Sequence, residues 1–163
     1  MERLRVLAVG RHPRRTLARI LVLVSGCYLV FGYCLLPIRV EGISMLPTYK
    51  NHSINFSNHL AYLWRNPRRG DVVTIRLAGP RVMYLKRIVG LPGEKVAFYR
   101  GQLFINDAPV EEPYLKYPSH WTVRPVTLGA TEYFVVGDNR TMRPEDHTFG
   151  KTDRSRIVGK VIL

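Results

Sequence analysis

Cysteine is absent from the chain after residue 34, and this excludes two common ways of stabilising a small domain. Neither a disulfide framework nor a cysteine-ligated zinc ion can hold the larger, C-terminal part together. The two cysteines, Cys27 and Cys34, lie in an uncharged apolar run and are interpreted as small apolar residues. The five histidines show no metal-binding spacing such as H-E-x-x-H. We therefore expect no metal site and no other cofactor.

Acidic residues are scarce: 12 Asp and Glu stand against 25 Lys and Arg, which gives a formal net charge of +13. Such an imbalance favours an anionic partner, either nucleic acid or an anionic membrane surface, and composition alone does not choose between them. Because 46% of the residues are hydrophobic, the chain is expected to fold. Its 163 residues suffice for one domain with a modest core.

Charge is missing altogether from residues 20–38, which read ILVLVSGCYLVFGYCLLPI. As a helix this run would reach about 28 Å, close to the hydrocarbon thickness of a bilayer. A cleavable signal peptide would have a shorter apolar core and a small-residue cleavage site, and a buried helix would need a larger protein around it. Six arginines precede the run and only Arg39 follows closely, so the positive-inside rule places the N-terminus in the cytoplasm.

The chain therefore divides into three parts: a basic cytoplasmic tail at 1–19, a transmembrane helix at 20–38 and a folded domain at 39–163. A basic segment beside a membrane span is expected on topological grounds, so we expect a lipid bilayer and no nucleic acid as partner.

The folded domain consists of short β-type runs separated by Gly and Pro, a pattern that predicts a compact, mainly β, antiparallel domain. Only 55–65 is compatible with a further short helix. The predicted strands are Asp71–Leu77, Val82–Val89, Lys95–Tyr99, Gln102–Ile105, Glu132–Val136 and Ile157–Ile162.

Ser44 follows the predicted membrane exit, in a loop with Gly42 before it and Pro47 after it. Glycine permits close approach of a substrate and proline stiffens the loop, although most loop serines are merely solvated.

Lys86 lies in an apolar strand, on the face that it shares with Tyr84. The neighbouring Arg87 lies on the opposite face and is expected in solvent. Burial lowers the pKa of a lysine, and a neutral amine can deprotonate a serine. A lysine snorkelling at a sheet edge is the alternative.

Four segments, in the same order, resemble the type I signal peptidases, which are membrane Ser–Lys proteases. The segment around Ser44 resembles their nucleophile box and the segment around Lys86 their lysine box. The four segments are GISMLPT (42–48), RNPRRGDVV (65–73), YLKRIVGLPG (84–93) and GDNR (137–140), the last with a tail at Gly150 and 157–160.

The resemblance implies that Ser44 is the nucleophile and Lys86 the general base. Supporting or oxyanion roles fall on Gly42 and Met45 beside the nucleophile, and on a group in the last segment: Asp138, Arg140, Thr141 and Glu145. It also implies preprotein substrates that carry signal peptides, with small residues at the first and third positions before the cut. The enzyme would sit in a bacterial-type cytoplasmic membrane, with the catalytic domain on the outer or periplasmic side.

The last segment departs from the family pattern between 141 and 147. Arg143 stands where a serine usually bonds the lysine, and His147 stands where an arginine supports the site. A re-registered loop would let Thr141 supply the missing hydroxyl, and Arg143 beside Lys86 would lower the pKa of that lysine further. His147 either pairs with a neighbouring acid or is solvated. Asp138 and Arg140 are interpreted as a structural pair.

Two other functions stay open. A non-catalytic, membrane-anchored binding module would explain the altered segment 141–147. A LexA-like self-cleaving protein would also use Ser and Lys, but it would need a DNA-binding N-terminus, and the run 20–38 argues against one. Four aromatic residues are candidates either for the lipid interface or for the core: Phe56, Tyr62, Trp64 and Trp121.

Overall fold

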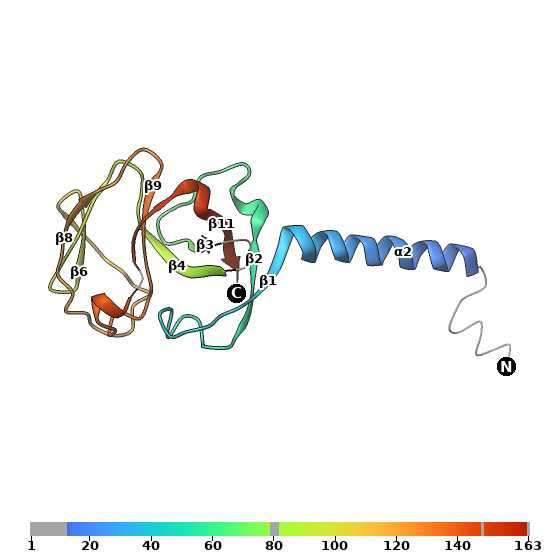
Figure 1. The fold of residues 1–163 in the computed structure, drawn as a ribbon, viewed down its shortest axis with the longest axis horizontal. Helices are drawn as coiled ribbons and strands as arrows, with labels where there is room; N and C mark the ends of the chain where they lie inside the picture. The colour runs from blue at the N-terminus through green and yellow to red at the C-terminus, as the bar shows by residue number, and fades with distance from the viewer. Residues whose placement is uncertain (1–12, 79–81, 148, 163) are drawn as a thin grey trace.

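A long N-terminal helix projects from a β-rich domain (Figure 1). The computed structural model describes residues 13–78, 82–147 and 149–162; most of the predicted basic tail lies outside them. Helix α2 (Pro13–Leu29) continues through a π-helical turn at Val30–Cys34. This span is long and apolar enough to cross a membrane, a test that a signal sequence also passes. The mainly β fold with one N-terminal apolar helix is thus confirmed.

The helix ends earlier than the sequence predicted. Its last turn closes at Cys34, and the final residues of the apolar run form strand β1 (Leu35–Arg39) instead. Pro37 explains the change, because it lacks an N–H and restricts the residue before it to extended backbone angles. The run therefore passes directly from helix into the sheet.

The larger sheet has seven antiparallel strands in the order β1-β2-β11-β3-β4-β9-β10. In it, β4 carries Lys86, and β1 leads into the loop with Ser44. The remaining strands are β2 (Ile54–Asn58), β11 (Ile157–Ile162), β3 (Val72–Ala78), β4 (Val82–Gly90), β9 (Glu132–Val136) and β10 (Gly150–Asp153).

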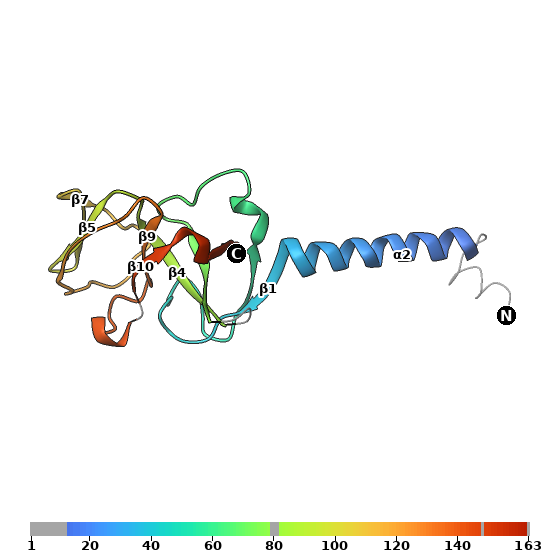
Figure 2. The same ribbon diagram turned by 45° about the horizontal axis from the view of Figure 1, so that its top comes forward.

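The smaller sheet lies at the end of the domain away from the helix (Figure 2). Its antiparallel order is β7-β6-β5-β8, and one core of aliphatic and aromatic side chains from this sheet and β9 holds the two sheets together. Its strands are β5 (Lys95–Tyr99), β6 (Gln102–Ile105), β7 (Ala108–Val110) and β8 (Val123–Thr127). Three 3₁₀ turns complete the described elements: η2 (His59–Tyr62), η3 (Pro144–Asp146) and η4 (Arg154–Arg156).

The expected helix at 55–65 is wrong, since this stretch holds β2 and the short turn η2. The residues of β2 alternate between buried and exposed, as a half-buried strand requires. The Asn58 side chain then accepts the N–H of Leu60 at 2.9 Å, which begins the turn. The six predicted strands all exist, whereas β1, β2, β7, β8 and β10 were not predicted.

Candidate active site

The loop between β1 and β2 holds Ser44 in a fixed turn. Gly42 has a φ of +100°, a left-handed conformation that glycine adopts without strain, and its N–H donates to Asn51 Oδ1 at 2.9 Å. Beyond Ser44, the side chains of Met45 and Tyr49 are buried in the core beneath the loop. The Tyr49 N–H donates to the Met45 carbonyl at 3.0 Å. The serine is therefore anchored from both sides.

Lys86 projects from β4 toward this loop. Its Nζ donates to Ser44 Oγ at 2.8 Å, and the lysine is only 3% exposed. Burial lowers the pKa of Lys86 from its usual 10.5 to about 8, and the Asp138 carboxylate opposes this by raising it. The structure thus brings together two residues that lie 42 positions apart in the chain. A lysine with this pKa is partly neutral near neutral pH.

The backbone of Ser44 is held by a residue that the sequence analysis did not single out. Asn139 donates its own N–H to the Ser44 carbonyl at 3.0 Å and its Nδ2 to the Ile43 carbonyl at 3.0 Å. Gly137 lies against the Ser44 carbonyl, because a Cβ built on Gly137 would be 2.2 Å from the Ser44 oxygen. Asn139 lies in the GDNR segment, and its position in that motif is the sequence feature by which its role beside Ser44 could have been predicted.

Arg87 and Asp138 form a buried, two-pronged ion pair next to the lysine. Arg87 Nε donates to Asp138 Oδ1 at 2.8 Å, and Nη2 donates to Oδ2 at 2.6 Å. Thr48, in the serine loop, donates to the same carboxylate at 2.6 Å. The expectation that Arg87 is solvated is therefore wrong: its guanidinium also lies over the Tyr114 ring at 3.9 Å, and the ring covers that face.

Arg140 pairs with Glu112, not with Asp138 as predicted. Its guanidinium makes two hydrogen bonds to the Glu112 carboxylate, at 3.0 and 2.5 Å, and its Nε donates to the Gly137 carbonyl at 2.9 Å. Arg140 is almost fully buried near the rings of Phe98 and Trp121. Glu112 comes from a loop far from the GDNR segment, so the local sequence gave no sign of the pair.

The altered segment does not surround Lys86 as its sequence suggested. Thr141 donates its hydroxyl to Asn139 Oδ1 at 2.6 Å. Arg143, 72% exposed in its side chain, pairs with Glu145 and Asp146 on the surface, and it is not among the causes that lower the lysine pKa. Glu145 is therefore a surface residue that pairs with Arg143.

His147 is buried edge-on against Trp121, with ring centroids 5.0 Å apart, and is not solvated.

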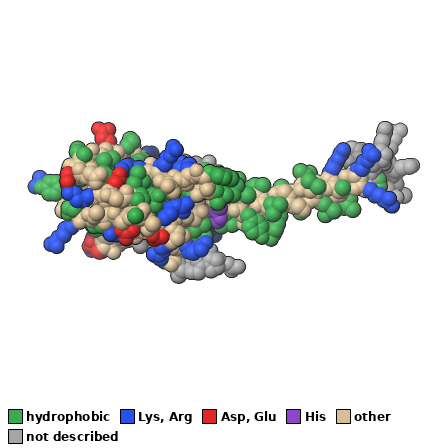
Figure 3. Space-filling view, turned by 90° about the horizontal axis from the view of Figure 1, so that it is seen from above, with side chains coloured by type: hydrophobic (Ala, Val, Ile, Leu, Met, Phe, Trp, Pro, Cys, Tyr) green, Lys and Arg blue, Asp and Glu red, His purple; other side chains and the backbone are tan. Residues whose placement is uncertain are grey.

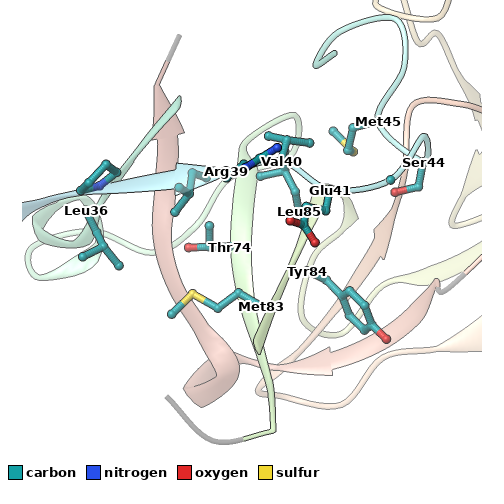
Figure 4. A pocket seen from close by; sticks show the side chains of 13 residues that line it. Leu36, Arg39, Val40, Glu41, Ser44, Met45, Thr74, Met83, Tyr84 and Leu85 are labelled. Atoms are coloured by element: carbon teal, nitrogen blue, oxygen red, sulfur yellow. The ribbon is translucent and has the colours of Figure 1, made fainter. Parts of the chain in front are cut away.

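A groove of about 310 Å³ leads from Ser44 along the domain (Figure 4). One wall is the chain from Leu36 to Met45, and the other is Met83–Leu85 of β4, with Thr74 also lining it. The first residues of β4 pair with β3 on one side, whereas β9 pairs only from Arg87 onward. The opposite edge of that strand end is therefore unpaired among the described residues, and it faces the groove. Such an edge can accept an extended peptide.

No group of three or more His, Cys, Asp and Glu residues within the described part of the chain is arranged to hold a metal ion. The chemistry that this arrangement offers is that of a hydroxyl and an amine in hydrogen-bond contact beside a groove.

Comparison with known proteins relates this geometry to a family. Residues 14–163 match the family described as signal peptidase, peptidase S26. The chain is 33% identical over 137 residues to signal peptidase I V of Bacillus subtilis (strain 168), covering 76% of this chain and 81% of that protein. It is 34% identical over 137 residues to signal peptidase I of Bacillus caldolyticus, covering 75% and 74%. For signal peptidase I of Leptolyngbya laminosa the identity is 31% over 128 residues, with 74% of this chain and 63% of that protein covered.

Among solved structures, a signal peptidase I from Enterococcus faecalis V583 aligns with a TM-score of 0.48 at 24% identity, over 60% of this chain and 98% of that chain. The family match extends over almost the whole sequence, from the N-terminal helix to the last residue. Two Bacillus relatives exceed 30% identity over three quarters of the chain. The chain therefore belongs to the type I signal peptidase family.

Proposed function

We propose that this chain is a membrane-bound serine endopeptidase that removes signal peptides from exported preproteins, with Ser44 as nucleophile and Lys86 as general base. The observation that carries the proposal is the 2.8 Å contact between Lys86 Nζ and Ser44 Oγ, made by a buried lysine whose pKa is lowered to about 8. In its neutral form the amine accepts the serine proton over this same separation.

The reaction then proceeds in two halves. Ser44 Oγ attacks the scissile carbonyl while its proton passes to Lys86 Nζ, and the tetrahedral intermediate collapses as the C–N bond breaks. The leaving amine takes the proton from Lys86, which leaves an ester on Ser44. Water next attacks this ester, and Lys86 accepts a proton from the water. As the ester C–O bond breaks, Lys86 returns this proton to Ser44 Oγ, and the product leaves as a carboxylic acid that ionises in solution.

The N–H groups of Ser44 and Met45 are the proposed donors for the developing oxyanion. In the part of the chain that the structure covers, neither donates a hydrogen bond to another group. Preorganised donors of this kind lower the barrier by about 3–4 kcal/mol each in comparable hydrolases. Asn139 and the buried Arg87–Asp138 pair hold the loop and the lysine in place. In this proposal Gly42, Thr141 and Arg140 are structural, and Glu145 is a surface residue.

The substrate would bind as an extended strand in the groove, between the chain leading to Ser44 and the unpaired edge of β4. Its small residues at the first and third positions before the cut would face the interior. Helix α2 would anchor the enzyme in a bacterial-type cytoplasmic membrane. The arginines at its N-terminal end (blue in Figure 3) support a cytoplasmic N-terminus and a catalytic domain on the outer side.

The test is cleavage of a preprotein by the full chain in liposomes, with Ser44→Ala and Lys86→Ala beside the wild type. Each variant is expected to lose activity by about 1,000-fold or more. The exposed Lys116 offers a matched control, since Lys116→Ala should cleave at the wild-type rate. Wild-type activity should rise with pH through about 8, where Lys86 becomes neutral.

Two outcomes would contradict the proposal. If Ser44→Ala and Lys86→Ala cleave as fast as the wild type, the catalytic pair is wrong. If the wild type cleaves nothing across this pH range, the chain is instead a membrane-anchored binding module.

A further inference from the structure

Glu41 is an acidic residue that has no partner among the described residues of a strongly basic protein. The chain has 12 acidic and 25 basic residues. Throughout residues 13–78, 82–147 and 149–162, every Asp and Glu side chain has an ion pair or hydrogen bond except Glu41 and Glu111. With basic residues in such excess, an acid without a partner at a functional groove calls for an explanation. Glu41 is in that place, since it lines the groove three residues before Ser44.

The backbone around Glu41 is oriented toward the groove. The preceding residue, Val40, bonds to the loop before β2: its N–H donates to the Ser53 carbonyl at 2.9 Å, and its carbonyl accepts the His52 N–H at 2.8 Å. In an extended chain the polar groups of successive residues point in opposite directions. Continued to Glu41, this alternation directs its N–H and carbonyl away from β2, to the side where a substrate strand would lie, and neither group has a hydrogen-bond partner among the described residues.

The side chains alternate in the same way. Val40 is buried in the core below the groove, whereas Glu41 lies on the exposed face. Figure 4 shows the Glu41 carboxylate between the chain that leads to Ser44 and β4. Within the described part of the chain, no basic side chain lies within ion-pair distance of Glu41: Arg39 donates to His52 Nδ1 at 3.3 Å, and Lys86 donates to Ser44 Oγ.

A strand bound beside Glu41 would present its side chains by the same rule. In the proposed binding mode, the residue whose carbonyl meets Ser44 would direct its side chain inward, to the side of the buried Val40 and Met45. The residue before it, second from the cut, then directs its side chain outward, to the face that carries Glu41. Side chains that neighbour each other across two strands have Cβ atoms about 5 Å apart, within reach of a charge pair.

We propose that Glu41 is a specificity-determining residue that favours Lys or Arg at the second position before the cleaved bond. This inference rests on the proposed peptidase function. The class of substrate is a preprotein whose cleavage region carries one positive charge flanked by two small residues. A partly exposed ion pair of this kind changes affinity by about two- to fivefold, and repulsion of an acidic residue adds a similar factor.

The experiment uses three peptides that differ only at this second position, which is Lys, Gln or Glu. For the wild-type full chain in detergent micelles, kcat/KM should be about three- to tenfold higher for the Lys peptide than for the Glu peptide. Glu41→Gln should bring this ratio close to one, and Glu41→Lys should invert it. Glu111→Gln, which removes the other acid that is unpaired in the described part of the chain, should keep the wild-type ratio. High salt should shrink the preference, because exposed charges are screened.

Binding of the same peptides to Ser44→Ala separates this inference from the proposed function. If the wild type cleaves all three peptides and Glu41→Gln leaves the Lys-to-Glu ratio unchanged, the role of Glu41 is wrong while the peptidase stands. If the wild type cleaves none, but Ser44→Ala binds the Lys peptide more tightly than the Glu peptide and Glu41→Gln abolishes this, the groove specificity stands without catalysis. Equal binding of all three peptides would overturn the inference in either case.

Discussion

At the scale of single residues, the amine of Lys86 is the most consequential group. Its surroundings act on it in opposite directions: burial against apolar neighbours disfavours the charge, and the carboxylate of Asp138 favours it. Burial dominates, so the pKa falls to about 8. The proposed base is therefore also a source of instability, because at neutral pH the folded protein must hold a charged amine away from water.

We predict that Lys86→Met stabilises the fold, and more so at pH 7 than at pH 10. Below about pH 8 the amine is charged in both the folded and the unfolded state, so the full cost of burial is present. As pH rises toward 10.5, the unfolded state holds more protons than the folded state, and the stability of the wild type increases. The gain from the substitution should thus be about 2 kcal/mol larger at pH 7 than at pH 10.

The measurement is urea unfolding of the full chain in micelles, followed by the fluorescence of the domain at both pH values. Lys116→Met is the matched control, because an exposed lysine should give no such difference between the two pH values. An equal effect of Lys86→Met at pH 7 and pH 10 would mean that the lysine is not depressed in pKa.

The proximity of Ser44 and Lys86 could be expected from the sequence because each lies in a recognisable local segment. The residues that surround the pair could not be predicted from the sequence. Alternation along β4 places Arg87 on the opposite face from Lys86, but it does not say that Tyr114 and Asp138, far along the chain, cover that face. Arg143 was expected beside Lys86 by its position in the motif, and the turn η3 instead directs it to the surface.

At the scale of elements, the end of β9 packs tightly against the loop that carries Ser44. Gly137 directly follows β9 and fits between the Ser44 carbonyl and the His147 ring. A Cβ there would be 2.2 Å from the carbonyl oxygen and 2.5 Å from His147 Cε1. Neither neighbour can move freely, because Asn139 holds the carbonyl and Trp121 packs against the histidine.

Gly137→Ala should therefore displace Ser44 from Lys86 and lower kcat/KM by about 10- to 100-fold, the usual cost of misplacing a catalytic group by about 1 Å. Preprotein cleavage at fixed pH measures the effect, and circular dichroism confirms that the domain is folded. Gly129→Ala is the control, since its methyl group would meet only the flexible Glu132 side chain. Wild-type activity in a folded Gly137→Ala protein would show that this contact does not position the serine.

Strands that alternate regularly or stay apolar could be predicted, and they account for the centre of the larger sheet. Three of the strands that were missed lack this signal. β1 contains Pro37, β7 has only three residues, and β10 carries charged side chains at two of its four positions. Each of these lies at an edge of its sheet, where such sequences are tolerated because only one side of the strand is paired.

At the scale of the whole molecule, an apolar surface continues from the helix onto the β domain. The Phe31 ring near the end of the helix lies 6.1 Å from the ring of Phe56 in β2. Hydrophobic side chains gather where the helix meets the domain (Figure 3). Three large ones at the ends of β2 and η2 are strongly exposed: Ile54, Leu63 and Trp64. Of the aromatic residues singled out in the sequence, Tyr62 and Trp121 belong to the core. Trp64 is 83% exposed, beside the turn η2.

Because the proposed anchor fixes this end of the domain near the bilayer, we expect Trp64 to lie in the lipid interface. The chain has two tryptophans, and Trp121 is only 4% exposed, so their fluorescence can be separated. In liposomes of brominated lipid, the wild type should lose a clear share of its tryptophan emission, and Trp64→Phe should lose almost none. Leu63→Asp combined with Trp64→Asp should then slow cleavage of a membrane-embedded preprotein while leaving a soluble peptide substrate unaffected. Equal quenching of wild type and Trp64→Phe would place this surface in water, with the helix alone holding the domain at the membrane.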